Sequence, residues 1–146
     1  MTPDFTLAIH GGAGTPPPEA FDPARAPGYH AGLRRALVAG RDILAAGGSA
    51  IDAVTAAVIE LENDPLFNAG HGAVYTAAGT HEMDAAIMDG RGRRAGAVAG
   101  ICGPKNPILA ARGDGEFAAR DAGRGRGDGV LPNPGPHLRA ARIFPH

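Results

Sequence analysis

The sequence has no tryptophan, a single cysteine (Cys102) and a single serine (Ser49) in 146 residues. One cysteine excludes an intrachain disulfide framework and a zinc site built from several cysteines, and it is typical of a reducing compartment. One serine, placed where it starts a helix, leaves no readable Ser-His-Asp triad. No apolar run is long enough to span a bilayer, and the first residues do not resemble a signal peptide. We therefore expect a cytoplasmic protein.

An excess of charge of one sign is also lacking, because 14 basic and 15 acidic residues give a formal net charge of -1. This balance provides no general attraction to nucleic acid or to an anionic membrane, and we expect neither as a partner. Aromatic residues make up only 5% of the chain, whereas it contains 23 glycines and 13 prolines. Such a composition predicts many turns and close backbone packing.

The hydrophobic pattern predicts an α+β fold with the order strand, helix, helix, hairpin, strand, helix. The predicted elements are a buried strand over Phe5–Ile9, a helix over Tyr29–Ala46 ended by Gly47 and Gly48, a second helix from Ser49 to about Asn63, a hairpin of Ala73–Thr76 with Glu82–Met88, a strand over residues 95–101, and a helix that begins at Pro107 with Asn106 as its N-cap. Ser49 and Asp52 have the spacing of a capping box, and Pro65 favours an end of the second helix just before it.

The character of the sequence changes after Arg112. Residues 113–146 show little periodicity and are dense in glycine, arginine, aspartate and proline. We predict one domain over residues 1–112 and an aberrant tail over residues 113–146 that is out of frame or disordered. An RGRG motif in this tail lacks the interleaved aromatic residues that are typical of single-stranded nucleic-acid binding.

Three sets of residues are candidate sites on chemical grounds. HGGAG, residues 10–14, could cradle a phosphate, but it lacks the Lys-Ser/Thr of a P-loop, and a tight turn after a strand is the alternative. The six histidines have no HExxH spacing, so a catalytic metal site is not indicated. Asp84 and Asp89 are either catalytic carboxylates or groups that pair near the ends of a hairpin.

The stretch LENDPLFNAGHGAVYT, residues 61–76, runs from a helical pattern into a turn. The carbonyl groups at a helix C-terminus have no partners within the helix, and a loop that curls there can aim several of them at one monovalent cation. Asn68 lies between the bulky Phe67 and the small Ala69 and Gly70. It is either a polar side chain held at a fixed site or an ordinary turn residue, and the residues leave both interpretations open.

Several segments together resemble a known family. IHGGAG, GGSAIDAVTAAVIELENDPLFNAGHGAVYTAAGTHEMDAAIMDG, AGAVAGI and NPILAAR follow one another within residues 1–112, and they resemble the plant-type L-asparaginases, also called isoaspartyl peptidases. These are N-terminal nucleophile hydrolases. The resemblance implies an αββα sandwich, of which this chain would hold an incomplete part. It also implies an (αβ)2 heterotetramer, no cofactor, and a structural sodium ion.

The activity that the resemblance implies is the hydrolysis of L-asparagine to L-aspartate and ammonia, and of β-aspartyl dipeptides. The nucleophile is a threonine that self-cleavage of the precursor places at a new N-terminus. In this picture Asn68 lies against the nucleophile, and Gly11 and Gly12 form a glycine loop near it. The sodium ion would be bound by the backbone carbonyls of Leu61, Glu62, Asp64, Phe67, Ala69 and His71.

The threonine nucleophile itself is not found in this sequence. No threonine stands in a context that matches the family's Thr-Val-Gly-like motif; the six are Thr2, Thr6, Thr15, Thr55, Thr76 and Thr80. We therefore expect the chain to be inactive alone, which leaves open whether it is an enzyme. One alternative is a non-catalytic remnant or subunit that binds a full-length partner. Another is a small anion-binding module that uses HGGAG.

The tail suggests why the nucleophile is missing. With suitable synonymous codons, residues 113–124 can be read one nucleotide later as VMENSPHVMLAG. That reading has the helix end and the strand that follow NPILAAR in the family. We therefore predict a truncated copy with a frameshift near Arg112.

Overall fold

The computed structural model describes residues 4–14 and 22–114, and the chain divides into two compact units, Met1–Val74 and Tyr75–His146. The described residues combine helices with one two-stranded antiparallel sheet, which confirms the α+β class. The complete αββα sandwich stays a prediction. The predicted tail lies outside the described residues from position 115 onward, and the predicted boundary after Arg112 falls within the last helix. None of the helices in the described ranges has the length and apolar character needed to cross a bilayer.

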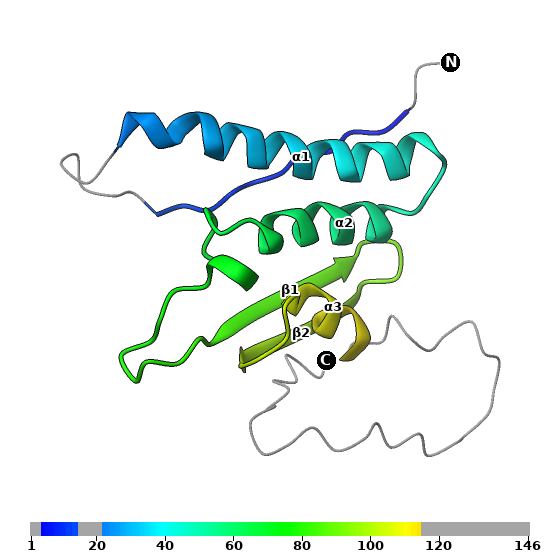
Figure 1. The fold of residues 1–146 in the computed structure, drawn as a ribbon. Helices are drawn as coiled ribbons and strands as arrows, with labels where there is room; N and C mark the ends of the chain where they lie inside the picture. The colour runs from blue at the N-terminus through cyan, green and yellow to red at the C-terminus, as the bar shows by residue number, and fades with distance from the viewer. Residues whose placement is uncertain (1–3, 15–21, 115–146) are drawn as a thin grey trace, which may run out of the picture. The chain divides into compact units, whose positions relative to one another are not determined.

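The first unit is built on two helices that run side by side in opposite directions, α1 (Ala26–Ala45) and α2 (Ala50–Asn63) (Figure 1). A short 3-10 helix, η2 (Pro23–Arg25), precedes α1, and another, η3 (Gly70–Gly72), follows α2. Helix α1 begins at Ala26, three residues before the predicted start at Tyr29. The earlier start includes Pro27, which the first turn tolerates because backbone N–H groups there have no partners within the helix.

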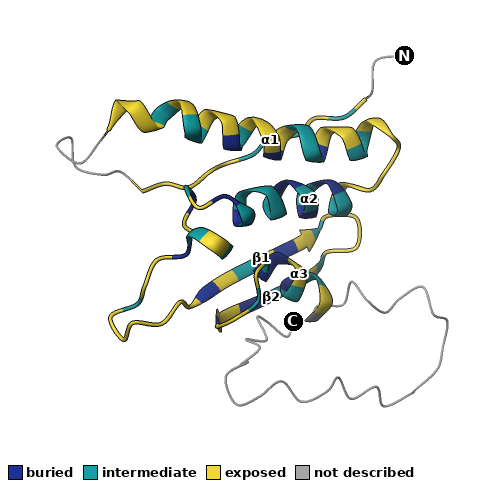
Figure 2. Ribbon diagram, in the orientation of Figure 1, coloured by how far each residue is buried: buried dark blue, intermediate teal, exposed yellow. Residues whose placement is uncertain are grey.

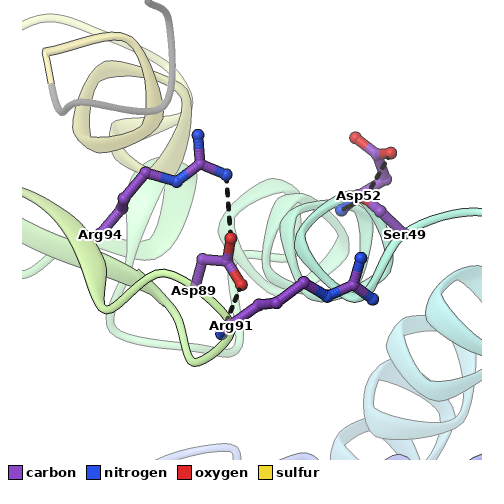
Figure 3. A network of polar contacts seen from close by, with 5 residues as sticks. All are labelled: Ser49, Asp52, Asp89, Arg91 and Arg94. Carbon is purple, nitrogen blue, oxygen red and sulfur yellow. Dashed lines mark hydrogen bonds and ion pairs between the residues drawn. The ribbon is translucent and has the colours of Figure 1, made fainter. Parts of the chain in front are cut away.

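The turn between α1 and α2 was predicted correctly from its sequence. Gly47 adopts a φ of 82°, and the N–H groups of Gly47 and Gly48 donate to the carbonyls of Leu44 and Ile43, as in a Schellman motif. Ser49 then caps α2, since its Oγ accepts the N–H of Asp52 at 3.1 Å and donates to the Asp52 carboxylate at 2.6 Å (Figure 3). The predicted N-cap at Ser49 is therefore confirmed, and the Asp52 carboxylate bonds to the Ser49 hydroxyl.

Small residues form the contact between the two helices. Gly32, Ala36 and Gly40, spaced by four, are the buried positions of α1, and Figure 2 shows the buried stretches of α1 on its side toward α2. A Cβ on Gly40 would lie 3.0 Å from the Ala53 carbonyl oxygen and 3.5 Å from the Ala57 Cβ. The alanines of α2 therefore allow the backbone of α1 to approach closely.

The predicted strand over Phe5–Ile9 is wrong, because no strand of the described residues pairs with it. The burial of this segment does alternate with a period of two, and Leu7 packs against α1 at Gly40, where a Cβ would lie 2.8 Å from its side chain. The alternating apolar side chains of this segment therefore pack on helix α1, and its backbone does not pair with a neighbouring strand. Helix α1 packs through its small residues, and the apolar side chain of Leu37 is 39% exposed.

The second unit is a hairpin covered by a helix. Strands β1 (Met83–Asp89) and β2 (Arg94–Ile101) pair antiparallel, and α3 (Pro107–Asp114) contacts both (Figure 1). The start of α3 at Pro107 was predicted correctly. One face of the hairpin and the inner side of α3 form the core; its buried residues are Met83, Ile87, Val98, Ile101, Pro107, Ile108 and Ala111.

The partner that was predicted for β1 is wrong. Ala73–Thr76 forms no ladder in the described part of the chain, although the Thr76 N–H donates to the Thr80 carbonyl at 2.8 Å and closes a turn there. Strand β1 pairs instead with β2 across the four-residue turn at 90–93. This pairing wins because it places the apolar residues of both strands on the one face that α3 covers.

Asp84 and Asp89 serve the hairpin, as the pairing interpretation predicted. Asp84 lies opposite a β-bulge, where its carboxylate accepts the N–H of Gly100, a residue with a φ of 63°. Asp89 accepts the N–H of Arg91 at 3.0 Å and pairs with the Arg94 guanidinium at 2.9 Å (Figure 3). The hydrogen bond from Arg94, followed by that from Arg91, lowers the pKa of Asp89 from its usual 3.8.

We expect Asp89→Asn to loosen the hairpin at pH 7, measured as faster amide hydrogen exchange in β1 and β2. A lowered folded-state pKa contributes stability that is present above the usual value and is lost as pH falls through the lowered one. The difference between variant and wild type should therefore shrink below about pH 4.

Arg94→Gln is the matched variant for this prediction, because it removes the other partner of the same pair. It should give the same loss at pH 7 and the same convergence in acid. A difference that stays constant from neutral pH to pH 2.5 would contradict the prediction.

Candidate functional site

The candidate site is residues 61–74 of the first unit, which comprise the last turn of α2 and the loop that follows it; this segment is called the loop below. Helix α2 ends at Asn63, and Asp64 leaves the helical conformation with a ψ of 119° just before Pro65. The Asp64 N–H still donates to the Leu61 carbonyl at 3.2 Å. The sequence folds this way because a residue before proline is driven out of the helical region.

Backbone hydrogen bonds curl this loop tightly. The donors and acceptors that follow Asp64 are Phe67 N–H to Asp64 O, Ala69 N–H to Phe67 O, Gly72 N–H to Ala69 O and Ala73 N–H to Gly70 O, at 2.8 to 3.2 Å. Of the six carbonyls predicted to bind a cation, those of Leu61, Asp64, Phe67 and Ala69 each accept one N–H. A carbonyl oxygen has two lone pairs, so each keeps a second for another ligand.

Phe67 anchors the loop to the rest of the unit. Its side chain is 5% exposed, and its ring meets that of Tyr29 on α1 edge-on, with 5.7 Å between centroids. Two glycines make room for it, because a Cβ on Gly11 would lie 2.9 Å from the ring and one on Gly32 would lie 2.6 Å from it. The structure thus brings Gly11 and the loop together, whereas the predicted place of Gly11 and Gly12 near a nucleophile stays a prediction.

Asp64 ties the loop to α1 by a second contact. Its carboxylate is 7% exposed; Oδ1 accepts the Leu66 N–H at 3.0 Å, and Oδ2 accepts a hydrogen bond from Arg35 at 2.5 Å. The same Oδ2 would lie 2.7 Å from a Cβ on Gly32. Gly32 therefore has to be small for the ring of Phe67 and for this carboxylate at once.

Asn68 closes the far end of the loop. Its Oδ1 accepts the Val74 N–H at 3.0 Å, while the residue itself is exposed. The side-chain amide nitrogen, which is a donor, lies on the same group. The carbonyl end of Asn68 is thus used to shape the loop. Its predicted contact with a nucleophile stays a prediction.

Gly72 is the tightest position of the loop. A Cβ there would lie 2.1 Å from the Phe67 carbonyl oxygen and 2.8 Å from that of Pro65. Real Cβ atoms do not approach backbone oxygens so closely, so only a hydrogen atom fits. Two carbonyl oxygens of the loop are thereby drawn toward one point of the backbone.

Gly12 has more open space around it than Gly11 has. A Cβ on Gly12 would meet nothing within 4 Å, and its N–H donates to Nδ1 of His10 at 3.1 Å. One of the N–H groups that a phosphate cradle in HGGAG would use is therefore bound to an imidazole nitrogen. This contact favours the turn interpretation of HGGAG.

The donor set of the loop fits a monovalent cation better than a transition metal. All six predicted ligands are neutral carbonyl oxygens, which suit hard cations, whereas zinc selects imidazole and thiolate. In the described ranges no three His, Cys, Asp or Glu side chains gather as a metal cluster. The chemistry of the predicted ligands thus suits a sodium ion, and the sodium site itself stays a prediction.

Arg35, Gly32 and Gly72 were not predicted from the sequence as part of this site. One signal was present, because Gly28, Gly32, Ala36 and Gly40 recur every four residues and so mark a close-packed helix face. No comparable signal marks Arg35, since a single arginine on a helix is most often a solvated residue.

Comparisons with known proteins agree with the motifs in this region. A family profile described as Asparaginase matches residues 3–114, which is most of the chain. This chain belongs to the asparaginase family. Among its relatives are an isoaspartyl peptidase of Salmonella typhimurium, 50% identical over 106 residues, and a plant-type L-asparaginase of Pyrococcus abyssi, 52% identical over 106 residues. An isoaspartyl peptidase/L-asparaginase of Xenopus laevis is 48% identical over 106 residues.

The chain spans about a third of the length of these relatives. Each match covers 73% of this chain, but 34% of the Salmonella protein and 33% of each of the other two. The matched part includes the loop and the segment that packs on it.

We expect Gly32→Ala to destabilise the first unit by about 1–3 kcal/mol in urea unfolding, because the new methyl group overlaps Phe67 and Asp64. This loss should outweigh the gain of about 1 kcal/mol that alanine brings to a helix interior.

Gly28→Ala is the matched control, since a Cβ there meets only the end of the flexible Leu66 side chain, at 2.9 Å. It should be neutral or stabilising. Equal effects of the two substitutions would contradict the role of Gly32 as the seat of Phe67.

Proposed function

We propose that residues 3–112 are the part of an isoaspartyl peptidase/L-asparaginase that supports its active site. The observation that carries this proposal is the curled loop after α2, anchored through Phe67 between Gly11 and Gly32. The segment LENDPLFNAG, which belongs to the family resemblance, also contains Phe67, the side chain on which α1 and Gly11 pack. The names of the relatives agree with this assignment.

In this proposal the residues of the loop position groups and do not perform the chemistry. The carbonyls of the six residues named above would hold a sodium ion, whose contribution is to keep the loop in one shape. Asn68, with its Oδ1 fixed by Val74, presents its amide N–H₂ as a donor toward the nucleophile. The substrates are L-asparagine and β-aspartyl peptides, and the complete protein assembles as an (αβ)2 heterotetramer.

The nucleophile belongs to a part of the family that this chain does not match. Among its threonines, the Thr55 hydroxyl donates to the Ile51 carbonyl at 2.6 Å inside α2, and those of Thr76 and Thr80 share a hydrogen bond at 2.9 Å. Thr6 is one of the exposed residues in the first segment, where exposed and half-buried residues alternate. None of these hydroxyls stands in the motif of a self-cleaving threonine, so we infer that the chain alone is inactive.

A chimera tests the proposed function directly. Residues 3–112 would replace the matching segment of the Salmonella typhimurium isoaspartyl peptidase, and hydrolysis of a β-aspartyl dipeptide would be measured. We expect kcat/KM within about tenfold of the host, a change of about 1.4 kcal/mol in transition-state stabilisation. Asn68→Ala in the chimera should lower kcat further.

The 146-residue chain is the negative control and should release neither ammonia nor amino acid. A chimera that folds and elutes like the host but has no activity would overturn the assignment. Turnover by the chain itself, abolished by substituting one of its threonines, would overturn the inference that it lacks a nucleophile.

We also propose that the codons after Arg112 are read out of frame. Two points support this: the family match ends at residue 114, and with suitable synonymous codons residues 113–124 can be read one nucleotide later with the apolar pattern of a helix end and a strand. Sequencing the gene from the codons of Asn106 and Pro107 onward is expected to show one inserted or deleted base, followed by a Thr-Val-Gly-like motif. A frame that holds as given, with no such motif, would refute this proposal.

A further inference from the structure

Arg35 of α1 forms an ion pair with Asp64 of the candidate loop. Its guanidinium donates to Asp64 Oδ2 at 2.5 Å, and Asp64 is both the residue that ends α2 and one of the proposed carbonyl ligands. The Arg35 side chain is 54% exposed, whereas the carboxylate that it meets is 7% exposed. One end of this pair therefore lies in solvent and the other lies inside the loop.

The segment whose carbonyls would bind the cation contains acidic side chains. Residues 61–71 contain two acidic side chains, Glu62 and Asp64, and no lysine or arginine. Both acidic residues are buried in the structure. A buried carboxylate needs a positive partner or strong hydrogen bonds, and Asp64 obtains its partner from α1, outside the loop.

We propose that Arg35 is a positioning residue that sets how strongly this loop binds a monovalent cation. It acts through Asp64 in two ways: it holds the start of the loop against α1, and its fixed positive charge opposes the charge of the arriving ion. This inference rests on the proposed function, because it takes the carbonyls of the loop as the cation ligands.

The two effects of Arg35 have opposite signs, which separates this role from a purely structural ion pair. An ordinary half-exposed pair adds a little stability at every sodium concentration. Removal of Arg35 should instead weaken the fold without sodium and strengthen the response to sodium, since less positive charge then faces the ion.

The experiment measures the thermal unfolding midpoint of the full chain in increasing NaCl, with choline chloride keeping the ionic strength constant. A ligand that binds the native state raises this midpoint, and at a given ligand concentration the rise is larger when binding is tighter. We expect the wild-type midpoint to rise with sodium. Arg35→Gln should start lower but rise more steeply, equivalent to roughly three- to tenfold tighter sodium binding.

Three further variants complete the design. Asp64→Asn, which keeps an acceptor for Leu66 but removes the charge, should flatten the sodium dependence. Arg35→Lys should restore the wild-type slope, because lysine keeps the charge. Arg34→Gln removes the same charge from the exposed neighbouring position on α1 and should leave the slope unchanged.

The outcomes separate the two proposals. A wild-type midpoint that ignores sodium overturns the cation loop and the role of Arg35 together. A sodium-dependent wild type with a parallel line for Arg35→Gln overturns only the role of Arg35. Sodium-23 line broadening on the same samples gives a second readout of binding. A chain without a cooperative transition or sodium broadening also overturns the inference, because the contacts that carry it would not form.

Discussion

The placement of the Phe67 ring between two glycines is the constraint on which the rest of the first unit depends. The ring cannot enter unless Gly11 and Gly32 have no side chains, and once it has entered, the loop on either side of it can lie in few places. Asp64 and Leu66 are then brought to α1, and Asn68 is brought to Val74. Three distant parts of the sequence are thus joined by one aromatic side chain.

Helix α1 can approach α2 and the Phe67 ring closely because its buried positions carry no large side chains. Large side chains on the inner face of α1 would add buried apolar surface, but they would also separate α1 from α2 and fill the place of Phe67. The small residues spaced by four give up some hydrophobic stabilisation, and they gain close approach of two backbones and a seat for the loop. A stripe of this kind is easily overlooked in a search for leucine and valine.

Local structure was predictable from the sequence where local chemistry decides it. Ser49 and Asp52 cap α2, Gly47 ends α1, and Pro107 starts α3, because each depends on neighbours within a few residues. The partner of β1 was not, since two short apolar runs compete for it and only the cover provided by α3 favours β2. Phe5–Ile9 has the alternation of a strand, but that pattern does not say whether a strand or a helix lies beside it. Arg35 could be found only from coordinates, because it reaches Asp64 across 29 positions of sequence.

Gly47 and Gly72 are glycines for different reasons, and their tolerance to altered stereochemistry should differ accordingly. Gly47 has open space around it, but its backbone has the left-handed conformation. Gly72 has no left-handed backbone, but two carbonyl oxygens occupy the place of a side chain. The first position is defined by handedness, so a D-amino acid introduced by chemical synthesis would suit its backbone better than any L-residue. The second is defined by volume, and no L-side chain fits it, however favourable its backbone preferences.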